Sequence, residues 1–318
     1  MMTEPQSLAE QIQAGEKRPI ARGLTWIERD SSKGKELIQA LFPNAGRAHI
    51  VGITGAPGVG KSTLVNRLAL TFRQNRLRVG ILAVDPSSPF SGGAILGDRI
   101  RMQDSVMDEG VFMRSLATRG HLGGLSRATF GAVTLLDAAG FDIIVIETVG
   151  AGQSEVEIMQ LAHSTMVVLA PGLGDDIQAI KAGILEIGQI FVVNKADREG
   201  ADHTVRAIRG MLTLGMKRPD WLPPILKTVA EGGQGIEDVV AALEKHRDHL
   251  KQSGRLDRIR QGQTAHLIQL ALEDLASGAL NAAKESDDWD TLLEGVRSGE
   301  RDAQAVAREI MRRRMTWD

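Results

Sequence analysis

The sequence contains no cysteine and no tyrosine among its 318 residues, and aromatic residues make up only 3% of it. Without cysteine the chain cannot form a disulfide bond, a thiolate metal site or a cysteine nucleophile. The shortage of aromatic side chains disfavours a carbohydrate-binding platform and a surface that stacks nucleic-acid bases. Glycine, in contrast, is abundant at 35 residues, which predicts loops that depend on backbone conformation.

Long hydrophobic runs and an excess of one charge are also absent. No apolar stretch approaches the roughly 20 residues that cross a bilayer, and the polar start does not resemble a secretory signal. We therefore expect a cytoplasmic protein, or a matrix protein in a eukaryote, without a membrane partner. Lys and Arg total 38 against 40 Asp and Glu, a net charge of −2, which argues against a nucleic-acid partner. The one tight basic run, Arg312–Arg314, also fits a solvated helix end.

Three parts follow one another along the chain. Residues 1–46 have apolar residues at helical spacing and are predicted to form an N-terminal helical extension, with Ser31 or Ser32 as the cap of its third helix. Residues 47–250 form the predicted main domain. Residues 251–318 lack strand-like runs and are predicted to be helical.

The main domain alternates strand-like and helix-like stretches. The predicted strands are His49–Thr54, Val79–Asp85, Val111–Leu116, Asp142–Glu147, Thr165–Ala170, Ile190–Asn194 and Ile225–Thr228. The predicted helices are Ser62–Gln74, Ser126–Ala139, Glu155–Ala162, Ile177–Ile187, His203–Leu214 and Ile236–Leu250. Because most of the strands are continuously apolar, they fit a parallel sheet buried on both faces. The fold class predicted is α/β, a layered sandwich with right-handed crossovers.

The C-terminal part carries an apolar stripe formed by Ile268, Leu272 and Leu275 at helical spacing. One interpretation is that these helices pack on the chain's own sheet domain. The other is that they form a dimerisation arm, which predicts a homodimer.

A phosphate-binding loop follows the first strand. Its residues are Gly55, Ala56, Pro57, Gly58, Val59, Gly60, Lys61, Ser62 and Thr63, which match G-x-x-x-x-G-K-[ST] between a strand and a helix. Glycines let successive backbone N–H groups point at phosphate oxygens, and the helix N-terminus adds its positive dipole end. We expect Lys61 to reach the β- and γ-phosphates, Ser62 to ligate Mg²⁺ and Thr63 to help hold the α-phosphate.

A second motif, N-K-x-D, follows a later strand with Asn194, Lys195 and Asp197. The Asp197 carboxylate can accept hydrogen bonds from guanine N1–H and the 2-amino group, whereas adenine has no donor at those positions. Asn194 is expected to brace the loop and approach the O6/N7 edge, and the Lys195 stem to cover the base. A second base-contacting loop is predicted from Lys227 through Thr228, Val229 and Ala230.

Carboxylates for the metal and the attacking water are predicted between these motifs. Glu147 ends an apolar strand and begins E-x-x-G, in which Gly150 can place its N–H at the γ-phosphate. A solvated glutamate at a strand end is the simpler alternative. Asp85 ends another apolar strand and Asp98 lies in the next glycine-rich segment, although Asp98 also fits a helix cap. Lys61, Asp85, Asp98 and Glu147 are thus the candidate catalytic residues.

Several neighbouring residues are candidates for further roles at the same site. Arg99 and Arg101 suit either neutralisation of transition-state charge or ordinary surface pairing, and Gln153 is a candidate for orienting water. The glycine-rich, acidic segment 171–183 enters a helix, so its aspartates suit a helix cap or a third loop that senses the nucleotide.

Taken together, these motifs resemble the metallochaperone P-loop GTPases of the ArgK/MeaB family, and more narrowly the MeaB-type chaperones of methylmalonyl-CoA mutase. The resemblance covers nearly the whole chain and rests on GAPGVGKST at 55–63, VDPSSPFSGGAILGDRIRM at 84–102, ETVGAGQSE at 147–155, PGLGDDIQAIKAG at 171–183 and NKAD at 194–197. It implies a P-loop NTPase three-layer sandwich with helical extensions, a homodimer, and slow GTP hydrolysis that the mutase accelerates. It also implies GTP-gated loading of adenosylcobalamin and protection of the mutase from inactivation.

Carried onto this chain, the resemblance implies that Lys61 and Ser62 bind phosphate and Mg²⁺. Asp85, Asp98 and Glu147 would form the acidic metal and water site, and Asn194 and Asp197 would read guanine. The absence of cysteine and the scattered histidines disfavour nickel delivery, so Mg²⁺ is the expected metal. A small-molecule kinase of the arginine/ornithine transport type is the alternative from another functional class.

Overall fold

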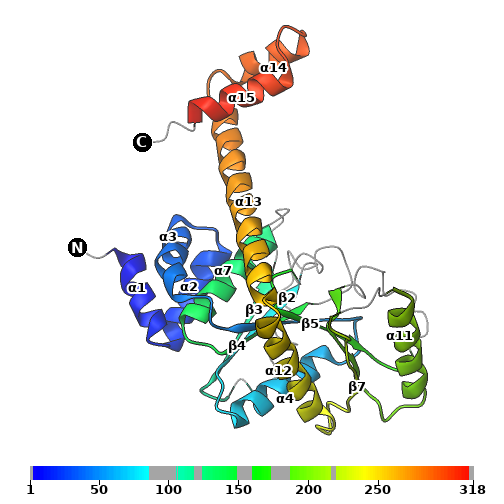
Figure 1. Ribbon diagram of the computed structural model, residues 1–318. Helices are drawn as coiled ribbons and strands as arrows, with labels where there is room; N and C mark the ends of the chain where they lie inside the picture. The colour runs from blue at the N-terminus through cyan, green and yellow to red at the C-terminus, as the bar shows by residue number, and fades with distance from the viewer. Residues whose placement is uncertain are drawn as a thin grey trace. The chain divides into compact units, whose positions relative to one another are not determined.

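The computed structural model describes residues 3–85, 105, 107–117, 124–148, 160–172, 187–215 and 220–314. The chain divides into two compact units, residues 1–257 and 258–318. The first unit contains a β-sheet and its covering helices, and the described residues of the second are helical or in turns (Figure 1).

Seven strands form one sheet in the described part of the first unit, in the order β3-β2-β4-β1-β5-β6-β7, and each adjacent pair is parallel. Their bounds are β1 His49–Thr54, β2 Val79–Asp85, β3 Val111–Ala117, β4 Ile143–Thr148, β5 Ser164–Leu169, β6 Ile190–Val193 and β7 Ile225–Lys227. The strands β1, β4, β5 and β6 are buried along their whole length, which explains their continuously apolar sequences. The predicted α/β class is confirmed.

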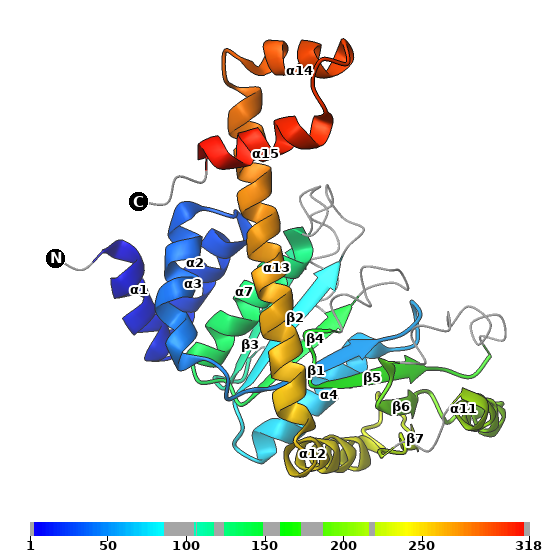
Figure 2. The same cartoon turned by 45° about the horizontal axis from the view of Figure 1, so that its top comes forward.

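Helices cover both faces of this sheet (Figure 2). On one face, α4 (Lys61–Gln74) and α12 (Ile236–Gln252) share a core with Val51 and Ile53 of β1. On the other face lie α7 (Gly124–Ala138) and, farther along the sheet, α11 (Ala201–Gly215). Since β1 lies between β4 and β5, its carboxyl end is the point of the open sheet where ligands characteristically bind.

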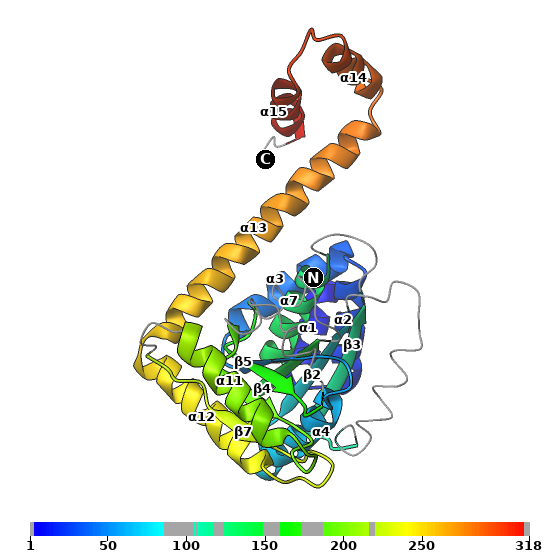
Figure 3. The same ribbon diagram turned by 90° about the vertical axis from the view of Figure 1, so that its right-hand side faces the viewer.

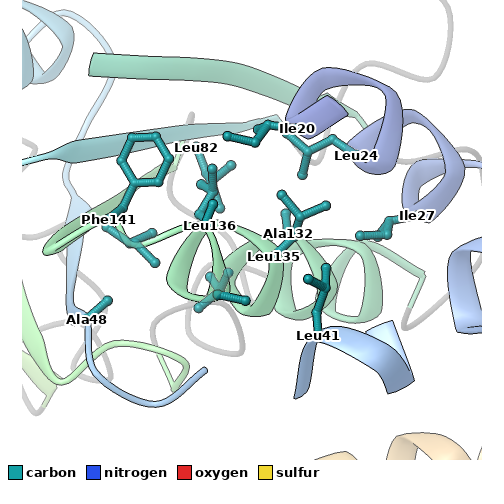
Figure 4. Packing of buried hydrophobic residues seen from close by; sticks show 14 of the residues in the cluster. Ile20, Leu24, Ile27, Leu41, Ala48, Leu82, Ala132, Leu135, Leu136 and Phe141 are labelled. Carbon is teal, nitrogen blue, oxygen red and sulfur yellow. The ribbon is translucent and has the colours of Figure 1, made fainter. Parts of the chain in front are cut away.

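The N-terminal helices share the core of the sheet domain. They are α1 (Glu4–Gln13), α2 (Lys17–Glu28) and α3 (Ser32–Leu41), followed by the short helix η1 (Phe42–Asn44). Ile20, Leu24 and Leu41 pack with Leu135 and Leu136 of α7 (Figure 4). Ser31 is the N-cap of α3, because its hydroxyl accepts a hydrogen bond from the backbone N–H of Gly34 at 3.1 Å.

A buried carboxylate fixes the entry into β1. Asp137 of α7 is 6% exposed and accepts hydrogen bonds from the backbone N–H groups of Gly46, Arg47 and Ala48 at 2.7, 3.0 and 3.1 Å. Three successive N–H groups converging on one carboxylate give strong, charge-assisted hydrogen bonds. Asp137 therefore attaches the end of the N-terminal extension to the layer of helices beneath it.

The second unit contains most of α13 (Arg255–Lys284), followed by α14 (Trp289–Arg297) and α15 (Ala303–Arg314), as Figure 3 shows. A small core joins the end of α13 to the other two helices, formed by Ala279, Ala283, Leu292, Val306 and Ile310. The predicted stripe lies on α13 and is solvent-accessible, with Ile268 58%, Leu272 55% and Leu275 50% exposed. None of the helices in the described ranges is both long and apolar enough to cross a membrane.

Most predicted elements agree with the structure to within one or two residues. Two of the predicted helices, 155–162 and 177–187, fall largely outside the described residues. The described end of the first is different from the prediction, because residues 160–161 form a turn and β5 begins at Ser164. A chain that must enter a central strand there has no room to continue a helix to Ala162.

Candidate nucleotide site

The loop between β1 and α4 has a backbone that only glycine accommodates at two positions. Gly55 has φ +147°, and a Cβ there would lie 2.1 Å from the carbonyl oxygen of Val168. Gly60, the N-cap of α4, has φ +93°, and a Cβ there would lie 2.5 Å from Asn194 Nδ2. The glycines of the motif are therefore required by the close approach of β5 and of Asn194 as well as by the turn itself.

Lys61 begins α4 and is only 7% exposed. Its Nζ donates hydrogen bonds to the carbonyl oxygens of Gly55 at 2.7 Å and Ala56 at 3.1 Å, so the ammonium group lies across the loop. Thr63 lies half-buried in the first turn of the same helix. A buried cation, a glycine-rich loop and a helix N-terminus together favour a phosphate group.

Glu147 lies beside this loop rather than in solvent. It is 2% exposed, and β4 places it next to Ile53 in the register of β1. Its Oε1 accepts a hydrogen bond from the Ser62 hydroxyl at 2.7 Å. The alternative of a solvated strand-end glutamate is therefore wrong. A hydroxyl and a carboxylate are the hard oxygen ligands that Mg²⁺ prefers, so this pair fits the expected metal.

The remaining predicted metal and water residues are only partly described. Asp85 is the last residue of β2, where its backbone pairs in parallel register with Ala117, and its side chain lies outside the described residues. Asp98, Gly150, Arg99, Arg101, Gln153 and most of 171–183 also lie outside them. Within the described ranges, no group of three or more His, Asp or Glu side chains is arranged to hold a metal ion.

Asn194 connects the two nucleotide motifs. It directly follows β6 and is 2% exposed, and its Nδ2 donates to the carbonyl oxygen of Val59 in the phosphate loop at 2.9 Å. Its Oδ1 accepts from Thr228 Oγ1 and from the backbone N–H of Ala230, both at 3.0 Å. The predicted bracing of the loop is therefore present, and it extends to the predicted second base loop.

Lys195 adds a second link between the motifs. Its backbone has φ +56°, a left-handed conformation that residues other than glycine rarely adopt. Its Nζ donates a hydrogen bond to the carbonyl oxygen of Gly58 at 2.6 Å. Asp197 is exposed in the turn that follows. The adjacent pocket of about 320 Å³ is lined by Pro57, Gly58, Ala170, Pro171, Gly172, Lys195, Arg198 and Glu199.

The second base loop follows β7. Thr228 and Ala230 are buried at 1% and 2% exposure, and Val229 is half-buried. Backbone hydrogen bonds from Ala196 N to Thr228 O and from Thr228 N to Val193 O join this loop to the N-K-x-D turn. The structure thus brings the two predicted base loops into direct contact.

One side chain that the sequence did not indicate also contacts this loop. Arg67 of α4 donates to the carbonyl oxygens of Ala230 and Glu231. An arginine on the polar side of a helix is ordinarily expected to be solvated, so no local sequence pattern predicts this contact with the loop.

Comparisons with known proteins agree with this geometry. A family model described as Methylmalonyl Co-A mutase-associated GTPase MeaB matches residues 20–285. GTPase ArgK of Escherichia coli (strain K12) is 35% identical over 299 residues, covering 90% of this chain and 90% of that protein. Methylmalonic aciduria type A homolog, mitochondrial, of Caenorhabditis elegans is 32% identical over 277 residues, covering 81% of this chain and 69% of that protein.

The solved structures include one with the same fold over its full length. The crystal structure of LAO/AO transport system kinase matches with a TM-score of 0.71 and 25% identity, covering 98% of each chain. The resemblance seen in the sequence motifs is confirmed, and the protein is a P-loop GTPase. The chain belongs to the family of methylmalonyl-CoA mutase-associated GTPases described by the MeaB model.

Proposed function

We propose that this GTPase binds GTP with Mg²⁺ at the carboxyl end of β1 and uses the residues named above in distinct roles. The loop from Gly55 to Gly60 and the ammonium group of Lys61 hold the phosphates. Asp197 reads the guanine base, while Asn194 and Lys195 keep its loop against the phosphate loop. Support comes from two hydrogen bonds to the phosphate loop. Asn194 donates to the carbonyl oxygen of Val59 at 2.9 Å, and Lys195 donates to that of Gly58 at 2.6 Å.

Ser62 and Glu147 would hold Mg²⁺, together with Asp85 and Asp98, while the backbone N–H of Gly150 would donate to the γ-phosphate. When bound, Mg²⁺ neutralises phosphate charge and holds the phosphate oxygens in place. The protein's own contribution is orientation: Glu147 fixes the Ser62 hydroxyl through the 2.7 Å hydrogen bond, and burial of Glu147 keeps its carboxylate away from competing water.

The partner of this GTPase is proposed to be adenosylcobalamin-dependent methylmalonyl-CoA mutase. The carrying observation is the match of residues 20–285 to a family named for its association with that mutase. The name of the Caenorhabditis elegans relative refers to methylmalonic aciduria and points to the same metabolism. The GTPase would gate cofactor loading and protect the mutase from inactivation, with conformational change as its output.

Turnover measurements test this partnership. GTP hydrolysis is measured with the full chain alone, with purified methylmalonyl-CoA mutase, and with serum albumin as an inert protein control. We expect the mutase alone to raise the rate, and the loading of adenosylcobalamin onto the mutase to depend on GTP. A rate that the mutase does not change would leave the GTPase activity and refute the chaperone role.

A small-molecule kinase is the alternative, since one solved relative is named a transport system kinase, whereas ArgK is named a GTPase. Product analysis separates the two functions. Release of inorganic phosphate without a phosphorylated acceptor supports hydrolysis. Stoichiometric transfer of phosphate to arginine or ornithine would establish the kinase instead.

We also propose that the protein is a homodimer joined through the C-terminal arm. The supporting observation is the exposed stripe of Ile268, Leu272 and Leu275 on α13, whose side chains are at least half exposed. Burial of these three side chains against a second copy would stabilise the pair by removing apolar surface from water. Light scattering should give a dimer for the full chain and a monomer for Leu272→Glu. A monomeric wild-type protein at micromolar concentration would refute the proposal.

A further inference from the structure

Arg67 attaches the second base loop to the helix that begins at the phosphate site. It lies in the second turn of α4, and its guanidinium group makes two hydrogen bonds with successive carbonyl oxygens. Nε donates to Ala230 O at 3.1 Å, and Nη2 donates to Glu231 O at 2.7 Å. The planar fork of arginine suits two neighbouring acceptors, which a single ammonium group could not reach in the same geometry.

The same loop is held from its opposite side by Asn194. The backbone N–H of Ala230 donates to Asn194 Oδ1, while the carbonyl oxygen of Ala230 accepts from Arg67. Both peptide groups of this buried residue are therefore fixed, one by the N-K-x-D motif and the other by α4. A residue held in this way has one orientation available to its backbone, which is what a loop that contacts a base requires.

The sequence after Ala230 makes this anchor necessary. Gly232, Gly233 and Gly235 follow within five residues, and Gly233 and Gly235 have positive φ angles of +77° and +75°. Such a glycine-rich segment has high conformational entropy when no hydrogen bond holds it to the rest of the protein. The backbone hydrogen bond from Val229 N to Gln234 O closes the loop on itself but does not attach it to α4. Arg67 supplies that attachment.

We propose that Arg67 is a positioning residue for guanine recognition, which holds the Thr228–Glu231 loop in the conformation that contacts the base. This inference rests on the proposed function, in which that loop and Asp197 read guanine. Because the hydrogen bonds of Arg67 go to the backbone of this loop, its loss affects discrimination between bases more than phosphate binding or turnover.

The test compares dissociation constants for GDP and ADP, both with Mg²⁺, in wild-type protein and Arg67→Met. Methionine keeps the apolar stem but removes both hydrogen bonds. We expect the dissociation constant for GDP to rise about tenfold and that for ADP to change less than twofold, so the preference for GDP falls about tenfold. The turnover number at saturating GTP should change less than twofold, while KM rises.

Arg73→Met is the matched control on the same helix. Arg73 donates to the Asp108 carboxylate and to the carbonyl oxygen of Leu77, both at the end of α4 distant from the base loops. Its replacement should lower the free energy of unfolding and leave the preference for GDP unchanged. Arg67→Lys, which keeps one charged donor, should recover part of the preference and replaces Arg67→Met in the comparison if that variant does not fold.

The outcomes distinguish this inference from the proposed function. An unchanged preference for GDP in the Arg67 variants would overturn the positioning role. Equal weakening of GDP and ADP would also overturn it, because it would show a general structural effect. If wild-type protein itself bound GDP and ADP equally, the proposed reading of guanine would fail first.

Discussion

Acid should destabilise the sheet domain through two buried histidines, His49 and His246. His49 begins β1 and is 6% exposed, and His246 lies on α12 and is 2% exposed. Both rings contact one hydroxyl group: Ser164 Oγ lies 3.0 Å from His49 Nε2 and 2.7 Å from His246 Nδ1. A hydroxyl between two imidazoles provides a good partner for neutral rings but offers no negative charge to stabilise a protonated one.

Burial is the main cause of the pKa shifts of both histidines. It lowers the pKa of His49 to about 2, assisted by the nearby His163 ring and the positive charges of Arg247 and Lys251, as well as by His246. It lowers the pKa of His246 to about 4, and there the neighbouring groups are His249 and Arg255.

The sign and the size of the effect follow from these values. An unfolded histidine titrates near pH 6.5, so the unfolded state binds more protons than the native state below that pH. Stability is therefore complete above about pH 6.5 and falls as the pH is lowered toward the native values. From about pH 7.5 to about pH 5 each histidine costs about 2 kcal/mol, or about 4 kcal/mol for the pair. The size of this loss of stability depends mainly on the pKa of histidine in the unfolded state, because the pKa values of both histidines in the native state lie below 5.

Urea unfolding followed by circular dichroism at the two pH values measures this effect. The double variant His49→Gln, His246→Asn places an amide where each imidazole nitrogen meets Ser164, but it cannot titrate. We expect the loss of stability on acidification to be about 4 kcal/mol smaller in the double variant than in wild type. His203→Gln, at an exposed position, is the control and should behave as wild type. Equal losses in wild type and the double variant would refute the reasoning.

Three further substitutions test other contacts. Asp197→Asn should reduce GTP affinity roughly 10- to 100-fold and favour xanthosine triphosphate, since an amide offers a donor where the carboxylate accepts; unchanged competition between the two nucleotides would contradict the base assignment. Glu147→Ala should lower the apparent Mg²⁺ affinity in GTP turnover roughly 10- to 100-fold with the base preference retained, and an unaltered Mg²⁺ titration would exclude its metal role. Asp137→Ala should lower the free energy of unfolding by about 3 kcal/mol in urea titrations, because three buried N–H groups lose their acceptor; a change below about 1 kcal/mol would show that water replaces it.

Local pattern predicted the sheet well because each central strand is buried on both faces. His49–Thr54 and Val79–Asp85 were predicted with the bounds that the structure has. In such strands most interior positions are apolar or small, so a run of apolar residues marks the strand, and only end residues such as His49 and Asp85 are polar. The N-cap at Ser31 could also be predicted from local sequence, because its hydroxyl accepts from the backbone N–H of Gly34, only three residues later.

The side-chain contacts of the site were harder to predict from local sequence patterns. Asn194 was expected to brace its loop, but the identity of its partners, Val59 and Ala230, follows from the order of strands in space. Arg67 and Asp137 contact backbone groups far away in sequence, and no spacing along the chain encodes such a partner. The motifs therefore predicted candidate site residues, whereas the side chains that connect their loops to the rest of the fold were found only in the structure.

The hydrogen bond between Ser62 and Glu147 joins two structural elements, and the same two side chains form the proposed Mg²⁺ site. The serine hydroxyl has one proton, and it donates that proton to Glu147 Oε1. Its lone pairs consequently point away from the carboxylate and are available to a cation beside the loop. Because Glu147 is at the end of β4 and Ser62 is in the first turn of α4, a cation bound to the hydroxyl would act on both elements at once. The strand end that begins the E-x-x-G motif is thus connected to the first turn of α4 by the hydrogen bond between Ser62 and Glu147.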